Sequence, residues 1–449
     1  MSEFEAVVAR VRERVDPTPS ERAELRDAAD RLVARTEDAL ADLGVEADVM
    51  QVGSTARGTW VRGDRDIDVF VRFDPELPRE DLEELGLEVG NRVLPDGHEE
   101  YAEHPYVKGT FEAYDVDLVP CYRVESATEI QSAVDRTPFH NVYLRERLTD
   151  DLAADVRLLK QFLKGIGAYG SDLRTQGFSG YLTELLVLEY GGFREVLTAA
   201  RDWQPPVEHD PAAHAAATFD DPLVVIDPTD PERNVAAVVS REQVARLQHY
   251  ARDLLDDPRE GVFFPTTRLA FDPTDVESHL ERRGTNVLAV RFDAPDLVED
   301  QLYPQLQRSR NGLVRGLENA GFEVLRSAAW ADESAVLFVE LTTATLPAVE
   351  RHEGPPVHVG EHATGFFEKY AEEDVYGPFL DGHRYVVERE RDVRTAAGFA
   401  TERLDEVALG TRVASIVEAG DYEVLADAEV ASLADEFGVE FAAYFDPIP

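Results

Sequence analysis

The chain has 449 residues, of which 43% are hydrophobic, and this length exceeds what one compact core supports, so we expect several domains. No segment approaches the roughly 18 uninterrupted apolar residues that a membrane helix requires, and the first residues are charged rather than apolar. We therefore predict a cytoplasmic protein without a membrane partner. The single cysteine, Cys121, excludes an internal disulfide and a cysteine-cluster metal site, and its apolar neighbours predict a buried position in a strand.

The charge is strongly one-sided, with 90 acidic residues against 45 lysines and arginines and a formal net charge of −45. Acidic residues are spread over the whole length, and such a chain repels itself in dilute salt. In molar salt the Debye length falls to about 3 Å and most of this repulsion disappears. The composition therefore predicts a halophilic protein, with an acidic mesophilic protein as the alternative. In concentrated salt the net charge no longer excludes a nucleic-acid partner, because little counterion release remains for any protein to exploit.

The first third of the chain mixes helix and strand patterns. Helical spacing covers residues 20–44, with Ser20 as the expected N-cap and Gly44 as the expected end, and a second helix is expected over 81–93. Strand patterns cover 47–52, 66–73 and 114–122. This order predicts an α+β head with a mixed sheet over residues 1–148.

The rest of the chain divides into a helical region and a second mixed region. Residues 149–260 are expected to form a helical central domain, with helices over 152–170 and 180–193 and a turn that leads into another helix near Asn234. Residues 261–449 are expected to form an α+β C-terminal region. Its expected strands are 263–271, 288–292, 337–341 and 384–390, and its expected helices are 302–320 and 398–408.

Two acidic residues lie two apart in the second expected strand. Asp66 and Asp68 therefore point to one face, and Ile67 points to the other. Paired carboxylates repel one another unless a cation neutralises them, which suits Mg²⁺. Because acids fill 90 of 449 positions, this spacing alone is also typical of a solvated strand edge. Its context favours a site, since Gly53 and Ser54 lie upstream where a strand meets a helix, a place suited to binding phosphate oxygens.

A third carboxylate follows in the strand 114–122. Asp117 is flanked by Val116 and Leu118, which predicts a position near the middle of a sheet. Asp115 is the alternative, because it is acidic and shares the same face. Three carboxylates on neighbouring strands would complete a site for two Mg²⁺ ions, as in two-metal nucleotidyl transfer.

These motifs resemble a known family. The segments VGSTARGTWVRGDRDIDVF and VDLVPCYRV are similar to the catalytic head of archaeal-type (class I) CCA-adding enzymes, within the polymerase-beta-like nucleotidyltransferase superfamily. The head motifs alone indicate only the superfamily, whereas further segments in the same order indicate the family. Those segments are TPFHNVYL, LLKQFLKGIGAYG, GFSGYLTELLVLEYG, DPTDPERN, PQLQRSRNGL, HEGPPV and GPFLDGHRYVVER.

The resemblance implies roles for individual residues. It implies that the metal ligands are Asp66, Asp68 and Asp117, although the family often carries glutamate at the first position. It implies that the triphosphate-binding loop contains Gly53, Ser54 and Arg57. It also implies that His140, Lys160 and Tyr169 contact the phosphates and sugar of the nucleotide, and that Arg233 reads the incoming base. Each has a structural alternative. His140 is equally a candidate buried histidine, Lys160 a side chain that snorkels from an apolar face, Tyr169 a core aromatic, and Arg233 an ion-pair partner at a helix N-terminus.

The resemblance also implies the reaction, which is template-independent addition of C, C and A to the 3′ end of tRNA from CTP and ATP, with release of pyrophosphate. It further implies that the protein is a homodimer. The alternatives are another RNA-tailing nucleotidyltransferase, such as a poly(A) polymerase, and a catalytically inactive RNA-binding relative. In the C-terminal region, islands of arginine suit phosphate contacts, with pairing to neighbouring acids as the alternative. The expected RNA-binding residues are Arg308, Arg310, Arg384 and Arg389.

Overall fold

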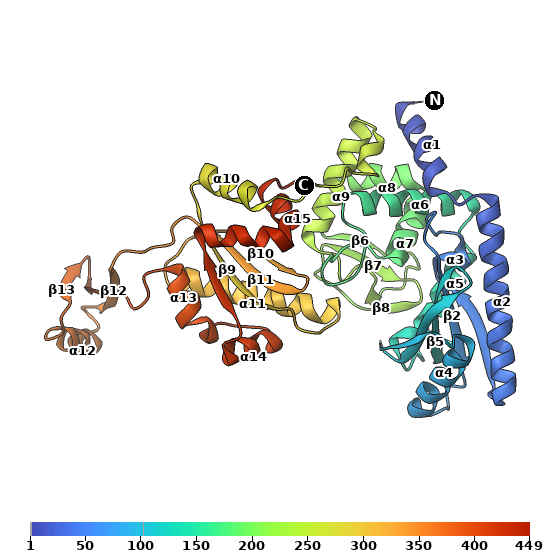
Figure 1. Ribbon diagram of the computed structural model, residues 1–449, viewed down its shortest axis with the longest axis horizontal. Helices are drawn as coiled ribbons and strands as arrows, with labels where there is room; N and C mark the ends of the chain where they lie inside the picture. The colour runs from blue at the N-terminus through green and yellow to red at the C-terminus, as the bar shows by residue number, and fades with distance from the viewer. Residues whose placement is uncertain (1, 102) are drawn as a thin grey trace. The chain divides into compact units, whose positions relative to one another are not determined.

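The computed structural model of the protein describes residues 2–101 and 103–449 and has the predicted α+β class (Figure 1). It divides into two compact units, residues 1–266 and 267–449. None of its helices, among these described residues, has the length and apolar character needed to cross a membrane. The predicted boundaries at 148 and 260 remain predictions, because only a division near residue 266 is resolved.

The head is built on a five-stranded mixed sheet in the order β1-β2-β5-β4-β3. Its strands are β1 (Ala47–Val52), β2 (Asp66–Phe73), β3 (His98–Tyr101), β4 (Pro105–Phe111) and β5 (Tyr114–Tyr122). Within this sheet β2 and β5 pair in parallel, and the other neighbours pair antiparallel. Alternate residues such as Ile67 and Val69 are fully buried against the helices α2 (Pro19–Leu43) and α4 (Arg79–Val93), which cover one face. The opposite face of the sheet is therefore left for the polar residues of β2 and β5.

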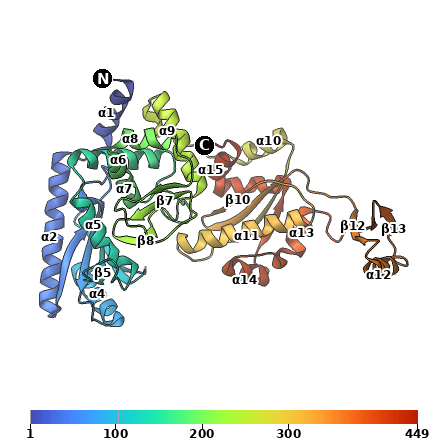
Figure 2. The same ribbon diagram turned by 180° about the vertical axis from the view of Figure 1, so that it is seen from behind.

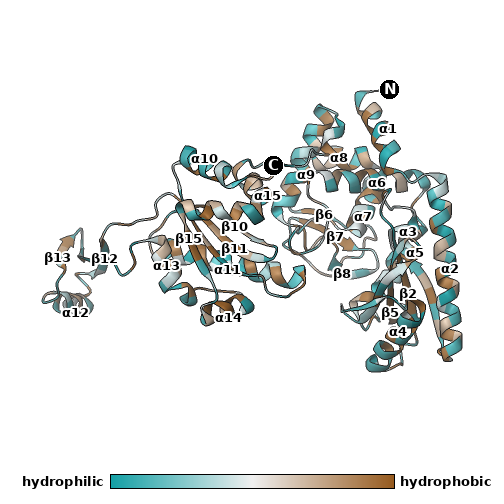
Figure 3. Ribbon diagram, in the orientation of Figure 1, coloured by the Kyte–Doolittle hydropathy of each residue, from teal (hydrophilic) through white to brown (hydrophobic). Residues whose placement is uncertain are grey.

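Helix α2 starts earlier than the sequence pattern predicts. Its N-cap is Thr18, whose hydroxyl accepts a hydrogen bond from the Glu21 amide while the Glu21 carboxylate accepts one from the Thr18 amide. With Pro19 in the first turn, this capping box outcompetes the expected cap at Ser20. The predicted end is confirmed, because Gly44 adopts the left-handed conformation with φ of 67°. Figure 3 shows the alternating polar and apolar colour expected of an amphipathic helix along α2.

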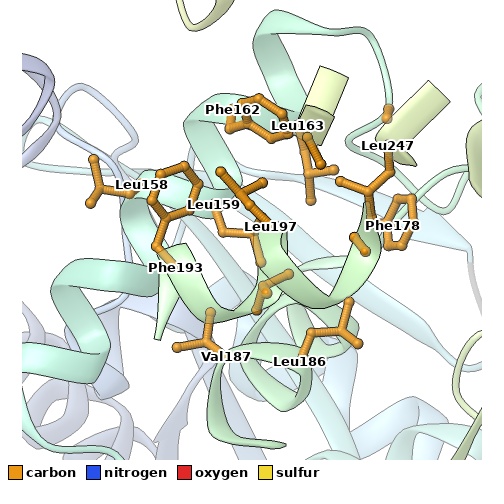
Figure 4. Packing of buried hydrophobic residues seen from close by; sticks show 14 of the residues in the cluster. Leu158, Leu159, Phe162, Leu163, Phe178, Leu186, Val187, Phe193, Leu197 and Leu247 are labelled. Carbon is orange, nitrogen blue, oxygen red and sulfur yellow. The ribbon is translucent and has the colours of Figure 1, made fainter. Parts of the chain in front are cut away.

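Helices from both ends of the first unit share one core. They are α1 (Glu3–Val15), α6 (Asp150–Gly165), α7 (Gly180–Tyr190), α8 (Phe193–Ala200) and α9 (Arg241–Asp256). Figure 4 shows Phe162, Phe193 and Leu197 meeting in the middle of this cluster. Two short helices, α3 (Gly53–Arg57) and α5 (Thr137–Arg145), connect it with the head sheet.

The helix expected near Asn234 does not form. A three-stranded sheet occupies this region instead, made of β6 (Val207–His209), β7 (Leu223–Asp227) and β8 (Asp230–Asn234). Side chains hold the tight β7–β8 hairpin, because Asp227 accepts from the Thr229 amide and Asn234 accepts from the amides of Val225 and Ala236. Such local side-chain to backbone bonds compete with helix formation.

The second unit contains a four-stranded sheet in the order β10-β11-β9-β15. The strands are β9 (Asn286–Asp293), β10 (Val324–Ala331), β11 (Ser334–Leu341) and β15 (Glu423–Ala426). Figure 2 shows α11 (Glu299–Asn319) lying across this sheet, and α13 (Ala396–Glu402) and α14 (Thr411–Ala419) share its core. The other face packs against α10 (Pro273–Arg283) and α15 (Ala434–Phe445). A smaller sheet joins β12 (Val349–Pro356), β13 (Tyr376–Asp381) and β14 (Arg384–Glu390) beside α12 (Gly360–Tyr370).

Two sequence predictions for residues 261–449 need correction. Residues 263–271, which are all described, contain no strand, because Phe263 packs into the helical core of the first unit instead. The helix expected over 398–408 ends at Glu402 and continues only as a short 3₁₀ turn, Leu404–Glu406. The strands predicted over 288–292, 337–341 and 384–390 are confirmed within β9, β11 and β14.

Candidate active site

The parallel pairing of β2 and β5 brings the predicted carboxylates together. Asp68 lies directly opposite Asp117, and Asp66 lies opposite Asp115. Their neighbours Ile67 and Val116 are fully buried on the helix-covered side, so the acidic side chains stand on the open face. This register distinguishes the two candidates for the third carboxylate, because Asp117 faces the half-buried Asp68, whereas Asp115 is exposed at the start of the strand.

Burial, with a smaller contribution from neighbouring carboxylates, raises the pKa of all three carboxylates. Burial, together with the charges of Asp117 and Asp66, raises the pKa of Asp68 to about 6. Burial is also the main cause of the raised pKa values of Asp66 and Asp117. The only cation within ion-pair distance of this group, among the described residues, is Lys108, whose Nζ lies 3.7 Å from Asp117 Oδ1. The cluster therefore carries a repulsion that a bound cation would relieve.

The donor chemistry fits a divalent cation. Carboxylate oxygens are the ligands that Mg²⁺ prefers, and these three project from neighbouring positions of one sheet face. Among the described residues, no three histidine, cysteine or acidic side chains are already arranged as a complete metal site.

Gly53 lies against the side chain of Asp68. Gly53 has φ of 76°, and a β-carbon built on it would lie 1.8 Å from Asp68 Oδ2, so only glycine fits. Ser54 follows in the first turn of α3. A cavity of about 480 Å³ opens here, between the acidic pair and an apolar wall that includes Phe70. Its lining is Val52, Gly53, Asp68, Phe70, Glu103, His104, Tyr106, Asp117, Val119, Ala133, Val134 and Thr137.

Arg57, the last residue of α3, forms a buried ion pair. Its guanidinium donates to both carboxylate oxygens of Glu184, at 3.1 and 2.9 Å, and to Asn141 Oδ1 at 3.1 Å. The hydroxyl of Thr59 also donates to Glu184, whose side chain is fully buried. These contacts of Arg57 connect α3 with α5 and α7.

Lys160 and Tyr169 lie together near the start of α7. The Lys160 Nζ and the Tyr169 hydroxyl both approach Gly180, where a β-carbon would lie 3.8 Å and 3.1 Å from them. Burial lowers the pKa of Lys160, although the charge of Glu184 opposes this shift. Lys160 is 3% exposed, and the described residues provide no hydrogen bond for its ammonium group. Such a cation gains from an anionic ligand.

His140 and Arg233 converge on Asp227, the first residue of the DPTDPERN segment, to which the sequence pattern assigns no role. His140 Nε2 and Arg233 Nη1 each lie 2.7 Å from Asp227 Oδ2. The His140 ring stacks on Tyr181, with ring centroids 3.9 Å apart. Arg233 is thus an ion-pair partner, but in strand β8 and not at a helix N-terminus.

The expected RNA-binding arginines differ in their surroundings. Arg308 on α11 is exposed and has no carboxylate partner among the described residues, and Arg310 donates to Asn311 Oδ1. Arg384 donates to the Gly354 carbonyl oxygen at 3.0 Å. Arg389 is paired with Glu350 at 2.8 Å, in agreement with the alternative that these arginines pair with neighbouring acids.

Three residues of this site are missing from the sequence prediction, namely Lys108, Glu184 and Asp227. Glu184 lies in the apolar helix segment TELLVLE, and an acidic residue among leucines indicates a buried carboxylate that needs a partner. Lys108 is one of only four lysines in the chain, and its pairing with Asp117 follows from the β4–β5 register. Asp227 sits in a turn whose sequence pattern predicts a helix start, so its long-range partners were hidden.

Comparison with known proteins places this geometry in a family. Residues 33–140 match the family model described as a nucleotidyltransferase domain, 154–264 match the second domain of tRNA nucleotidyltransferase, and 283–427 match the C-terminal domain of CCA-adding enzyme. A protein of Halobacterium salinarum named CCA-adding enzyme is 66% identical over the whole of both chains. Relatives of the same name share 61% identity in Haloarcula marismortui, over all of this chain and 99% of the relative, and 42% in Methanosarcina barkeri, over 94% of each chain. The chain therefore belongs to the family of CCA-adding enzymes.

Proposed function

We propose that this chain completes the 3′ end of tRNA at the open face of the head sheet, with Asp66, Asp68 and Asp117 holding two Mg²⁺ ions. Family membership gives the reaction, which is addition of C, C and A. The observation that carries the proposed site is the parallel register that sets Asp68 opposite Asp117, beside the glycine turn at Gly53. When bound, the metal ions would neutralise phosphate charge and acidify the attacking hydroxyl.

The chemistry at this face is a single displacement, repeated for each nucleotide. The 3′ oxygen of the RNA forms a bond to the α-phosphorus of CTP or ATP, the bond from that phosphorus to the bridging oxygen breaks, and pyrophosphate leaves. Gly53 lets the backbone approach the acidic pair, and Ser54 offers a hydroxyl next to it. Lys160 and Tyr169, with His140, are proposed to bind the phosphates and sugar of the incoming nucleotide.

Arg233 is proposed to read the base. A guanidinium group only donates hydrogen bonds. Cytosine and adenine both present an unprotonated ring nitrogen on the pairing edge, whereas uracil and guanine present an N–H at the equivalent place. An arginine directed at that edge therefore accepts C and A and rejects U and G, because two donors would face each other.

The tRNA is proposed to lie along the second unit, in a homodimer that works in the cytoplasm. Arg308 is the best placed of the expected contacts, because it is exposed on α11 and no carboxylate of the described residues neutralises it. Arg310 neighbours it on the same helix, and Arg384 and Arg389 belong to β14. An enzyme that serves every tRNA must recognise shape and backbone, for which arginine is suited.

A nucleotide-incorporation assay tests the proposal. Purified protein in concentrated KCl is mixed with tRNA that lacks its last three nucleotides, CTP, ATP and Mg²⁺. We expect CCA to be added once, and Asp117→Asn to abolish addition by leaving the cation one ligand short. Asp115→Asn is the matched control, since it makes the same change on the same strand face and should keep most of the activity.

Two results would overturn the proposed site. One is addition at the wild-type rate by Asp117→Asn, and the other is an equal loss in Asp115→Asn, which would show that general charge on this face matters rather than Asp117. An open-ended tail on the RNA would point to a poly(A)-type polymerase instead.

A further inference from the structure

The carboxylate of Asp227, at the end of β7, joins two residues of the proposed nucleotide site. Its Oδ2 atom lies 2.7 Å from both His140 Nε2 and Arg233 Nη1. His140 lies on α5 and Arg233 lies on β8, so their separation is not set by the geometry of one helix or strand. Their common contact with Asp227 Oδ2 holds the two side chains near each other.

The environment of Asp227 keeps this carboxylate ionised. Its side chain is fully buried, which alone would raise its pKa, but the hydrogen bonds from His140 and Thr229 hold the pKa below its ordinary value. The Thr229 amide and hydroxyl donate to Oδ1 at 2.9 and 2.8 Å. The Tyr181 hydroxyl approaches the same oxygen at 3.4 Å. A buried carboxylate with this many donors is fixed in position as well as in charge.

The turn that carries Asp227 is also anchored from outside. His214 Nε2 lies 3.0 Å from the Asp227 carbonyl oxygen, and Arg136 pairs with Asp230 at 3.0 Å. Backbone and side chain of Asp227 are therefore both held by hydrogen bonds.

Arg233 is held by one end only. Its Nη1 atom bonds to Asp227, and among the described residues its Nε and Nη2 atoms have no hydrogen-bond partner. The side chain is 37% exposed, so these donors are open to a ligand. Because a guanidinium group is planar and rigid, the hydrogen bond from Arg233 Nη1 to Asp227 also restricts the directions in which Nε and Nη2 can point.

We infer that Asp227 is the positioning residue for base selection, because its carboxylate aims the free donors of Arg233 and sets them at a fixed place relative to His140. The inference rests on the proposed role of Arg233. Without the carboxylate, Arg233 can turn away from the pairing edge of the base, and the penalty against an N–H on that edge is lost. Asp227 itself touches neither base nor phosphate in this arrangement.

Steady-state kinetics of the full-length enzyme on tRNA ending before its first C test the inference. We expect Asp227→Asn to lower kcat/KM for CTP by about 10- to 100-fold, the range for one charge-assisted hydrogen bond. The deciding measurement is the ratio of kcat/KM for UTP to that for CTP, which should rise at least about tenfold. This ratio does not depend on how much of the preparation is folded, so a merely structural defect leaves it unchanged.

Glu232→Gln is the matched control, because it also neutralises a carboxylate of the β7–β8 hairpin, but one that is exposed and forms no ion pair among the described residues. Its UTP to CTP ratio should equal that of the wild type. Thr229→Val removes one donor to Asp227 and should raise the ratio by less than Asp227→Asn does. An unchanged ratio in both Asp227→Asn and Thr229→Val would overturn the inference. Absence of CCA addition by the wild-type protein would instead overturn the proposed function.

Discussion

Asp68 places stability and chemistry in conflict at a single residue. Its side chain is half-buried, and burial together with the charges of Asp117 and Asp66 raises its pKa from 3.8 to about 6. Between these two pKa values the folded state binds more protons than the unfolded state, so the free energy of unfolding falls as pH rises from about 4 to 6 and then levels off. The ionised carboxylate that a metal needs is thus destabilising to the fold.

We expect Asp68→Asn to be more stable than the wild type at pH 7.5, by roughly 2 kcal/mol, because asparagine removes the buried repulsion. The difference between the two proteins should vanish near pH 4. Urea unfolding in concentrated KCl with chelator present, across this pH range, measures it. A wild-type protein as stable as the variant at pH 7.5 contradicts the expectation, and activity should be lost in the variant at every pH.

The sequence alone predicts which face of a strand each candidate side chain occupies. Alternation in DIDVF put Asp66 and Asp68 on one face, and apolar flanks put Asp117 near a sheet centre. Sequence could not provide partners across the fold, since the contact between Arg57 and Glu184 spans 127 residues. The same limit hid Asp227, which meets His140 across 87 residues.

Elements were predicted well where hydrophobic periodicity is regular and poorly where side chains bond to backbone. Strands β1, β2 and β5 have the predicted bounds, because each is a short, largely apolar run that begins with alternating polar and apolar residues. The β7–β8 hairpin replaces a predicted helix start, because Asp227 and Asn234 shape it through bonds to nearby amides. Strand β10 carries Arg326 and Trp330 between small residues and has no apolar run to mark it.

A buried ion pair joins three elements of the second unit. Glu340 on β11 is fully buried and accepts hydrogen bonds from Arg283 at the end of α10, at 2.6 and 3.0 Å. Thr285 and Tyr444, the latter on α15, donate to the same carboxylate at 2.7 and 2.9 Å. This arrangement fixes α10 and α15 on the same sheet face.

We expect Glu340→Gln to lower the free energy of unfolding of the second unit by about 2–4 kcal/mol, because it leaves the Arg283 guanidinium without its counter-charge. Urea unfolding followed by tryptophan fluorescence reports it, since Trp330 packs in the adjoining core. Glu350→Gln removes an ion pair with the partly exposed Arg389 and should cost less than about 1 kcal/mol. Equal losses in the two variants would show that burial of Glu340 is unimportant.

The charge of the whole molecule sets its working conditions. A net charge of −45 over one chain favours expansion whenever the salt is too dilute to screen it. Relatives from Halobacterium and Haloarcula at 66% and 61% identity agree with a halophilic protein. Ion pairs at the surface reduce this self-repulsion only locally, because acids outnumber lysines and arginines two to one.

We expect helical circular dichroism and CCA addition to be retained in about 3 M KCl and lost after dialysis to about 0.1 M, where the Debye length is roughly 10 Å. Sucrose at matched osmolality should not replace the salt if screening is the cause. Full ellipticity at 0.1 M would count against the halophilic interpretation.

The scarcity of lysine gives the protein a built-in chemical label. Two of its four lysines, Lys108 and Lys164, lie close enough to Asp66 for their charges to lower its pKa. Lys160 is buried near Gly180, and Lys369 is exposed on α12. Apart from the α-amino group, an amine-acylating reagent therefore meets few sites, and protection of Lys108 and Lys164 by a ligand can be compared with Lys369 as an internal standard. Most proteins need engineering before amine modification becomes this selective, whereas here adaptation to salt has already removed the background.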